Sequence, residues 1–311
     1  MPVLANLRLL AFAALPLLSQ TLENPPTALA FHSASRSLRP IIGMPGSSYL
    51  GAPLLSDLDF ASIAPDQKTG IAVSNGSFMF IRNIQDPASV SAPIENAIAA
   101  VDQVLWSVDS TTAILLSSTQ REIQWITAGQ AVTLCSLANL SGKIRLLAAD
   151  PQAQVAIVAA AGQLFRITNE TAPTLLATVG NPTAAVFDRT GQVLYVADAA
   201  VRQIFELRYG TQTAFLKGAE EIEDPVALAL SEDGTLLYVA SQSSRSVAAF
   251  RTADSSLVGR LSLDWAPTSF TFLSRGTFLL NRTAPAGEPL SVLTTHDGLA
   301  EAFIPTGDVK P

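Results

Sequence analysis

The chain has a single cysteine, Cys135, and only two histidines, His32 and His296, among its 311 residues. One cysteine cannot form a disulfide within the chain, which excludes a disulfide-stapled fold, and we expect Cys135 to be a buried structural thiol. A typical zinc site takes three or four protein ligands. The two histidines alone do not supply them, so we expect both to lie at exposed turns rather than on a metal.

Charge is also scarce: charged residues make up 14% of the chain, the net charge is -7, and no basic run is present. A surface for nucleic acid needs clustered lysine and arginine, so the sequence argues against nucleic acid as a partner. Apolar residues reach 48%, with 19 prolines and 18 glycines. This composition favours a folded, strand-rich protein over a disordered one.

Long apolar runs are limited to the N-terminus. Arg8 is followed by apolar residues 9–18 and then by a polar stretch, residues 19–24. This pattern is typical of a signal peptide, the run is too short to cross a bilayer, and Pro16 argues against the alternative of a buried helix. We therefore predict a signal peptide over residues 1–24 and a single domain over residues 25–311 with no membrane span. The protein is then expected to be periplasmic or secreted.

Several catalytic and cofactor motifs are missing as well. The chain has no Gly-x-Ser-x-Gly nucleophile motif, no Cys-x-x-Cys-His haem motif and no phosphate-binding loop. With two histidines, a Ser-His-Asp triad also has few residues to draw on. We therefore predict no catalytic residue and no cofactor.

What the chain does have is an internal repeat. Residues 182–198 and 225–241 are near-copies that lie 43 residues apart, each running from a proline through a turn to an apolar strand containing Leu-Tyr-Val-Ala. A period of about 40–45 residues built from short strands is typical of a β-propeller. The residue that opens the turn between the first two strands recurs at spacings of 38 to 43 residues, at Asp66, Asp109, Asp150, Asp188, Ser231 and Ser274. The four aspartates are explained by turn chemistry, in which Asp accepts bonds from nearby backbone N–H groups, rather than by an acidic metal-binding ring.

The number of blades depends on the N-terminal segment. Six units are clear, and residues 26–33 align with residues 182–189 as the start of a seventh. That unit is short and has Pro40 inside a strand, which suits an edge strand or a distorted blade. We predict an all-β propeller of four-stranded blades. Seven blades with an incomplete first one are favoured, and six blades plus an N-terminal hairpin are the alternative.

Two of the repeats resemble a known family. Residues 194–198, followed by residues 202–205, resemble the core of an NHL repeat, and residues 231–240, with residues 246–250, resemble a YVTN repeat. The chain thus resembles bacterial exported propellers of the YVTN/NHL type, within the WD40/YVTN-like superfamily. The resemblance implies a non-catalytic binding or scaffolding module of the cell envelope or exterior, and it supplies no catalytic residue that transfers to this chain.

Metal-dependent propeller hydrolases and lactonases are the alternative that the resemblance leaves open. Such enzymes hold a divalent cation at the mouth of the channel with oxygen ligands from several blades, as hard cations require. The candidates here follow the second strands, at Asn75, Asp198, Gln242 and Asn281. Only one of the four is charged, which is too little for a tight cation site. We therefore predict no metal site.

A recurring arginine marks the candidate binding surface. It lies just before the third strand at Arg121, Arg202 and Arg245, and Arg282 lies in the corresponding hairpin of the last unit. In a propeller these hairpins share a face with the loops that lead into each first strand, one of which contains Trp265. Two interpretations stay open. The guanidinium groups pack on neighbouring blades, or they form, with Trp265, a surface for a protein or an anionic ligand, since arginine and tryptophan are common anchors.

Overall fold

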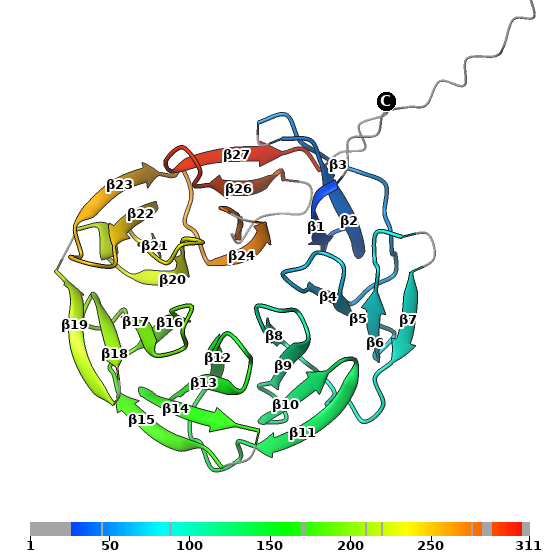
Figure 1. Ribbon diagram of the computed structural model, residues 1–311, viewed down its shortest axis with the longest axis horizontal. Helices are drawn as coiled ribbons and strands as arrows, with labels where there is room; N and C mark the ends of the chain where they lie inside the picture. The colour runs from blue at the N-terminus through cyan, green and yellow to red at the C-terminus, as the bar shows by residue number, and fades with distance from the viewer. Residues whose placement is uncertain are drawn as a thin grey trace, which may run out of the picture.

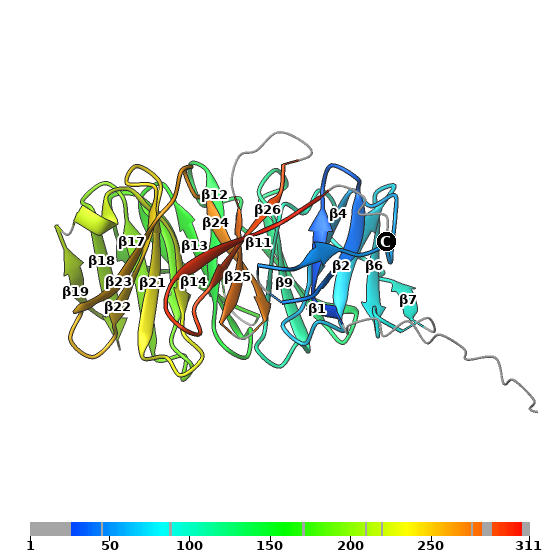
Figure 2. The same cartoon turned by 90° about the horizontal axis from the view of Figure 1, so that it is seen from above.

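A computed structural model describes residues 26–44, 46–86, 89–169, 172–208, 210–218, 220–274, 276–281 and 288–306. Within these ranges the chain is all-β and folds into a flat ring of seven antiparallel sheets, a seven-bladed β-propeller (Figure 1, Figure 2). The described part of the chain has one short 3-10 helix, η1 (Glu220–Ile222), and no helix long and apolar enough to span a membrane. The predicted signal peptide and Arg282 lie outside the described residues.

Each blade is formed by consecutive strands, and the first strand of each blade lies innermost in the ring (Figure 1). Blade 1 has β1 (Pro26–His32), β2 (Ser37–Ile42) and β3 (Tyr49–Leu50). Blade 2 has β4 (Phe60–Ile63), β5 (Gly70–Ser74), β6 (Ser77–Arg82) and β7 (Val90–Pro93). Blade 3 has β8 (Gln103–Trp106), β9 (Thr112–Ser117), β10 (Glu122–Thr127) and β11 (Gln130–Ser136). Blade 4 has β12 (Ile144–Ala149), β13 (Val155–Ala160), β14 (Gln163–Thr168) and β15 (Thr174–Thr178).

The last three blades complete the ring. Blade 5 has β16 (Pro182–Phe187), β17 (Val193–Asp198), β18 (Gln203–Arg208) and β19 (Thr211–Lys217). Blade 6 has β20 (Pro225–Leu230), β21 (Leu236–Ser241), β22 (Ser246–Arg251) and β23 (Leu257–Ser262). Blade 7 has β24 (Ser269–Ser274), β25 (Thr277–Asn281), β26 (Leu290–Thr294) and β27 (Ala300–Ile304).

The first blade is the incomplete one. Its sheet has three strands and the other six sheets have four, so the expectation of seven blades is confirmed and the six-blade alternative is wrong. Pro40 lies inside β2 and has no N–H to give to the opposite carbonyl, that of Gly51. The buried Arg39 side chain replaces it, because its Nε donates to that carbonyl at 2.8 Å. The proline is therefore tolerated in a central strand, not only at an edge.

The hydrophobic core lies between neighbouring blades. Second strands are apolar on both faces, as in β17, in which all six residues are buried. Ile157 of blade 4, for example, packs in one cluster with Leu194 and Leu207 of blade 5. Outer strands such as β11 alternate instead, with every second side chain exposed. This is the pattern of blades that are buried at the centre and hydrated at the rim.

The turn aspartates act as expected. Asp66 Oδ1 accepts bonds from the N–H groups of Lys68 and Thr69 at 2.9 and 2.8 Å. In the next three blades the carboxylates of Asp109, Asp150 and Asp188 likewise accept backbone N–H bonds, from the residue two positions on at Asp109 and from those four and five positions on at the other two. These carboxylates hold the first and second strands in register on one face of the ring.

The ring is closed between blade 7 and blade 1 by side-chain packing. Among the described residues, each of these sheets is built from one end of the chain, so no strand crosses between them. Leu273 and Val292 of blade 7 pack there in one cluster with Ala30 and Ile41 of blade 1. Burial of apolar surface is therefore the main described link at the closure.

Candidate functional site

The antiparallel blades place two kinds of connection on the same face of the ring. These are the hairpins between second and third strands and the loops that lead from one blade into the next. We call this the loop face, and it forms the upper side of the ring in Figure 2. Arg121, Arg202, Arg245 and Trp265 all lie on it, as predicted.

Arg121 reaches from the hairpin between β9 and β10 to the loop that leads into blade 4. Its Nη1 donates to the Gly142 carbonyl at 3.0 Å and its Nη2 donates to the Leu140 carbonyl. The backbone takes part as well, because the Leu137 N–H donates to the Arg121 carbonyl at 2.7 Å. Arg121 therefore ties blade 3 to the start of blade 4.

Arg202 and Arg245 make corresponding but looser contacts. Arg202 Nη1 lies 3.2 Å from Glu223 Oε1, in the loop leading into blade 6, and the two side chains are 63% and 45% exposed. Arg245 Nη1 donates to the Asp264 carbonyl at 3.5 Å, in the loop leading into blade 7. Both guanidinium groups thus contact the next blade and keep part of their surface in solvent.

The backbone gives a physical reason for these contacts. Arg121, Arg202 and Arg245 have φ values of 57°, 50° and 46°, in the left-handed region. For a residue with a Cβ, this backbone conformation is about 1 kcal/mol less favourable than the right-handed one. A side chain that bonds to the next blade offsets that cost. The geometry accordingly agrees with the packing interpretation of the arginines, while their exposed surface keeps the binding interpretation as a proposal.

Trp265 lies in the loop leading into β24 and is half-buried. Its Nε1 donates to Glu301 Oε1 at 3.0 Å, and the Ser291 hydroxyl donates to the same oxygen. The indole packs against the cluster that contains Phe278 and Leu293. Trp265 therefore links the loop face to blade 7, and only part of its surface faces solvent.

Of the four candidate cation ligands, two bond to other groups of the protein and two are exposed. Asp198 is 1% exposed, and its carboxylate accepts three backbone N–H bonds at 2.7 to 3.0 Å, from Gly180, Asn181 and Ala200. Asn281 donates to the hydroxyls of Ser269 and Thr271 at 2.9 and 2.8 Å. Asn75 and Gln242 are exposed hairpin residues. Within the described ranges, no group of three or more His, Cys, Asp or Glu residues is placed to hold a metal ion.

The histidines and the cysteine lie apart from one another. His32 is the last residue of β1 and is half-buried, so the expected exposed turn position is wrong for it. Its Nδ1 bonds to Ser35 Oγ at 2.7 Å, and partial burial, and secondarily the charge of Arg39, lower its pKa. His296 is exposed, as expected, in the turn after β26. Cys135 is half-buried on β11 rather than fully buried, because β11 is an outermost strand, and this partial burial raises the pKa of its thiol.

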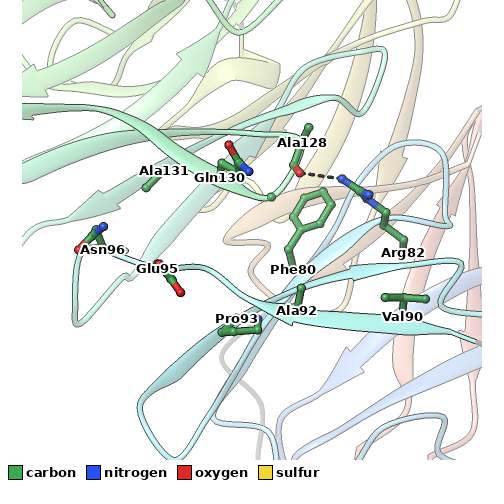
Figure 3. Close-up of a pocket in the computed structure, with 11 residues that line it drawn as sticks. Phe80, Arg82, Val90, Ala92, Pro93, Glu95, Asn96, Ala128, Gln130 and Ala131 are labelled. Atoms are coloured by element: carbon green, nitrogen blue, oxygen red, sulfur yellow. Dashed lines mark hydrogen bonds between the residues drawn. The ribbon is translucent and has the colours of Figure 1, made fainter.

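Sequence reasoning missed a groove of about 630 Å³ at the outer rim, between blades 2 and 3 (Figure 3). Phe80 forms its floor, and Arg82 lies over that ring with its guanidinium carbon 5.3 Å from the ring centroid. Arg82 Nη2 also donates to the Ala128 carbonyl, at 2.7 Å. The remaining lining comes from β7, from the residues after it, and from the β10–β11 turn and the start of β11, at Val90, Ala92, Pro93, Glu95, Asn96, Gly129, Gln130 and Ala131. The one sequence signal was the short fourth strand of this blade, which ends in a proline.

The chain is similar in fold to several solved structures. Virginiamycin B lyase from Staphylococcus aureus aligns over 80% of this chain and 84% of its own, at 13% identity and a TM-score of 0.59. A functionally unknown protein from Desulfotomaculum acetoxidans aligns over 90% and 99%, at 14% identity and a TM-score of 0.61. A chain of the mitotic checkpoint complex aligns over 100% and 90%, at 12% identity and a TM-score of 0.59.

No protein-family model and no curated protein sequence matches the chain. At identities of 12–14%, the likeness to these structures shows the propeller fold alone. An enzyme and a component of a multiprotein complex share that fold, so function has to be inferred from the surfaces of this chain.

Proposed function

We propose that this protein is a non-catalytic binding or scaffolding propeller of the cell envelope or exterior, with the loop face as its partner surface. The observation that carries the proposal is the construction of that face. Arg121, Arg202 and Arg245 tie each hairpin to the loop that leads into the next blade. Loops held on a rigid frame are where binding residues concentrate in proteins.

The chemistry of the face suits a protein partner. Exposed Arg202 and Arg245 lie beside acidic residues of the neighbouring loops, and the apolar Val201 is 49% exposed at a hairpin tip. Arginine is enriched at the centres of protein interfaces, with polar residues around it. The N-terminal pattern of Arg8 followed by apolar residues 9–18 supports export, and the YVTN/NHL type of repeat remains part of this proposal.

The test compares capture of partners from the native cell envelope by the unmodified protein and by the Arg202→Ala, Arg245→Ala double variant. We expect the double variant to lose the partner while its melting temperature falls by no more than about 2–4 °C, since exposed ion pairs contribute about 1 kcal/mol or less. Unchanged capture by a folded double variant would reject the loop face as the partner surface. A larger drop in melting temperature would show that the two arginines stabilise the packing of the blades, and it would contradict the binding proposal.

A further inference from the structure

The groove at the rim exists because blade 2 is narrower than its neighbour. Its outermost strand, β7, has four residues, whereas β11 of blade 3 has seven. Leu134 of β11 pairs with Gln124, which pairs with Leu115, a residue that packs toward blade 2. Residues directly opposite each other share a face of the sheet, so Leu134 also faces blade 2. It is 52% exposed, apolar residues of other outermost strands such as Leu175 and Phe303 are exposed as well, and it lies outside the groove lining.

The outer edge of β7 has backbone groups that point away from the blade. The Ile94 N–H donates to the Phe78 carbonyl at 2.9 Å, which makes this a hydrogen-bonded pair of the β6–β7 ladder. Such pairs alternate in an antiparallel ladder, so the backbone N–H and carbonyl groups of Ala92 and Val90 also point inward, toward β6. The N–H and carbonyl of Ser91 and the carbonyl of Pro93 therefore point outward, where no described strand pairs with them.

The two ends of the groove differ in charge. Arg82 lies at the end where β7 begins, and among the described residues the one hydrogen bond of its side chain goes to the neutral Ala128 carbonyl. Glu95 lies at the other end, after β7 has finished. Between them, the floor is apolar, with Phe80, Val90 and Ala92. A groove of about 630 Å³ is within the usual range for a ligand site.

We propose that this groove binds a short extended peptide segment of another protein, which adds as an antiparallel strand to the outer edge of β7. The guest pairs with Ser91 and places alternate apolar side chains against Val90 and Ala92, which line the groove, with Val90 59% exposed. In the antiparallel direction its C-terminal end lies at Arg82, so an acidic residue or a terminal carboxylate is preferred there. A basic residue is preferred at the other end, near Glu95. Strand addition of this kind obtains affinity from main-chain bonds and specificity from alternate side chains.

Two features limit the guest to a short segment. β7 has only four residues, and Pro93 has no N–H to offer. Short edges that contain proline resist open-ended pairing between copies of a protein. The site lies on the rim, apart from the arginines of the loop face, so it goes beyond the proposed function and is tested separately from it.

The binding test uses a fluorescein-labelled hexapeptide with lysine first, alternating valine and threonine inside, and a C-terminal aspartate. Fluorescence anisotropy measures its affinity for the purified protein. We expect saturable binding that is about tenfold weaker for the peptide with lysine and aspartate exchanged, since one charge-assisted bond is worth about 1.4 kcal/mol or more. Absence of saturable binding, or equal binding of the two peptides, would overturn the proposal.

The variants locate the contact. Ser91→Pro removes an N–H that points into solvent, so we expect the melting temperature to stay the same and the affinity to fall about tenfold, while Ser91→Ala binds normally. Arg82→Gln should weaken binding by a similar factor. Arg251→Gln is the matched control, because Arg251 ends the third strand of blade 6 as Arg82 ends that of blade 2. Equal effects of Arg251→Gln and Arg82→Gln would mean non-specific attraction and overturn the assignment.

Two further measurements keep the outcome clear. If the Ser91→Pro variant does not fold, amide hydrogen exchange in the unmodified protein tests the same contact. Bound peptide should slow exchange of the Ser91 N–H by about tenfold. Unchanged exchange at Ser91 would reject strand addition. If the protein is instead a dimer that Ser91→Pro converts to a monomer, the occupant is a second copy and the peptide proposal is wrong. Arg202→Ala should leave peptide binding unchanged, which separates a failure here from a failure of the loop face.

Discussion

The last residue of a second strand has a recurring task in this protein. Its side chain holds the loop that leads into the same blade, through hydroxyl bonds of 2.7 to 3.0 Å to backbone carbonyls from Ser74, Ser117 and Ser241. In blade 5 the residue is Asp198, which accepts N–H bonds from the loop instead. The carboxylate that sequence reasoning considered as a cation ligand is therefore one member of a structural series.

We expect Asp198→Ala to lower the free energy of unfolding by about 2 kcal/mol, because the N–H groups of Gly180, Asn181 and Ala200 lose a charged acceptor. Gln242→Ala, at an exposed position, should change it by less than about 0.5 kcal/mol. Urea unfolding with and without EDTA measures both. A stabilisation by micromolar calcium or zinc that disappears in Asp198→Ala would contradict this interpretation and identify Asp198 as a metal ligand.

Acid should weaken the turns between first and second strands. Bonds from the Ser231 hydroxyl and then from Thr235 lower the pKa of Asp233 to about 2, and hydrogen bonds lower the pKa of Asp109. At Asp188 partial burial raises the pKa, but the hydrogen bonds together outweigh it and the pKa is again lowered. A carboxyl whose pKa is lower in the folded state stabilises the fold above its unfolded value of about 4, and this contribution is lost as the pH falls toward 2. We expect the urea midpoint to drop across that window and to drop less in Asp233→Asn. An identical pH dependence in both proteins would contradict this assignment.

Hairpins and loops act as pairs across blade boundaries. The contact is closest at Arg121, which bonds to two carbonyls, and loosest at Arg245, whose single bond is 3.5 Å long. The same sequence position therefore contributes differently in different blades, according to what the next loop presents.

We expect Arg121→Ala to lower the free energy of unfolding by about 1–2 kcal/mol and Arg245→Ala by less than about 0.5 kcal/mol. Arg121→Lys should recover only part of the loss, since one ammonium group does not reproduce a planar fork that reaches two carbonyls. Thermal or urea unfolding of the three variants measures this order. Equal effects at Arg121 and Arg245 would show that the bonds to Leu140 and Gly142 carry little energy.

The β10–β11 hairpin needs a glycine where it meets the groove. Gly129 has φ of 87°, and a Cβ there would lie 2.8 Å from the Phe80 ring. Gly210 occupies the corresponding turn of blade 5 with φ of 79°, and a Cβ there would meet nothing within 4 Å. We expect backbone strain to lower the free energy of unfolding by about 1 kcal/mol in both alanine variants. In Gly129→Ala the contact with Phe80 should lower it by about 1–2 kcal/mol more. Equal losses in urea unfolding would mean that the hairpin moves off Phe80 without cost.

The whole ring depends on the contact between its first and last blades. No described strand is exchanged there, so the closure rests on apolar packing around Leu273, which is 2% exposed. Blades elsewhere are also linked by side-chain bonds between innermost strands, as between Gln103 and Leu146 at 2.8 Å. Loss of packing at the closure should be felt by every blade, because each is stabilised by its neighbours.

We expect Leu273→Ala to lower the free energy of unfolding by about 2–5 kcal/mol and to leave a single calorimetric transition at a lower temperature. Leu134→Ala, on the exposed rim, should change stability by less than about 0.5 kcal/mol. Two separate transitions in Leu273→Ala would show that blade 1 unfolds by itself and that the ring is not one cooperative unit.

The sequence by itself determined the fold class, and it favoured seven blades while leaving six open. Strand alternation, apolar second strands and the turn residues at Asp66, Asp109 and Asp188 are local features, because they depend on side chains within a few residues of each other. A repeat of such units at a nearly constant period leaves a ring of blades as the consistent arrangement. For the same reason, the arginine positions on one face could be predicted from their place before the third strand.

Only the tertiary structure decided what those side chains contact. Arg121 and Leu140 lie 19 residues apart, and the acceptors of Arg121 lie in the loop that leads into the next blade. The groove depends on the unequal lengths of β7 and β11 and on the position of the β10–β11 hairpin over Phe80. Such contacts are set by how separate sheets pack, and the packing of sheets is not encoded in the local pattern of any one of them.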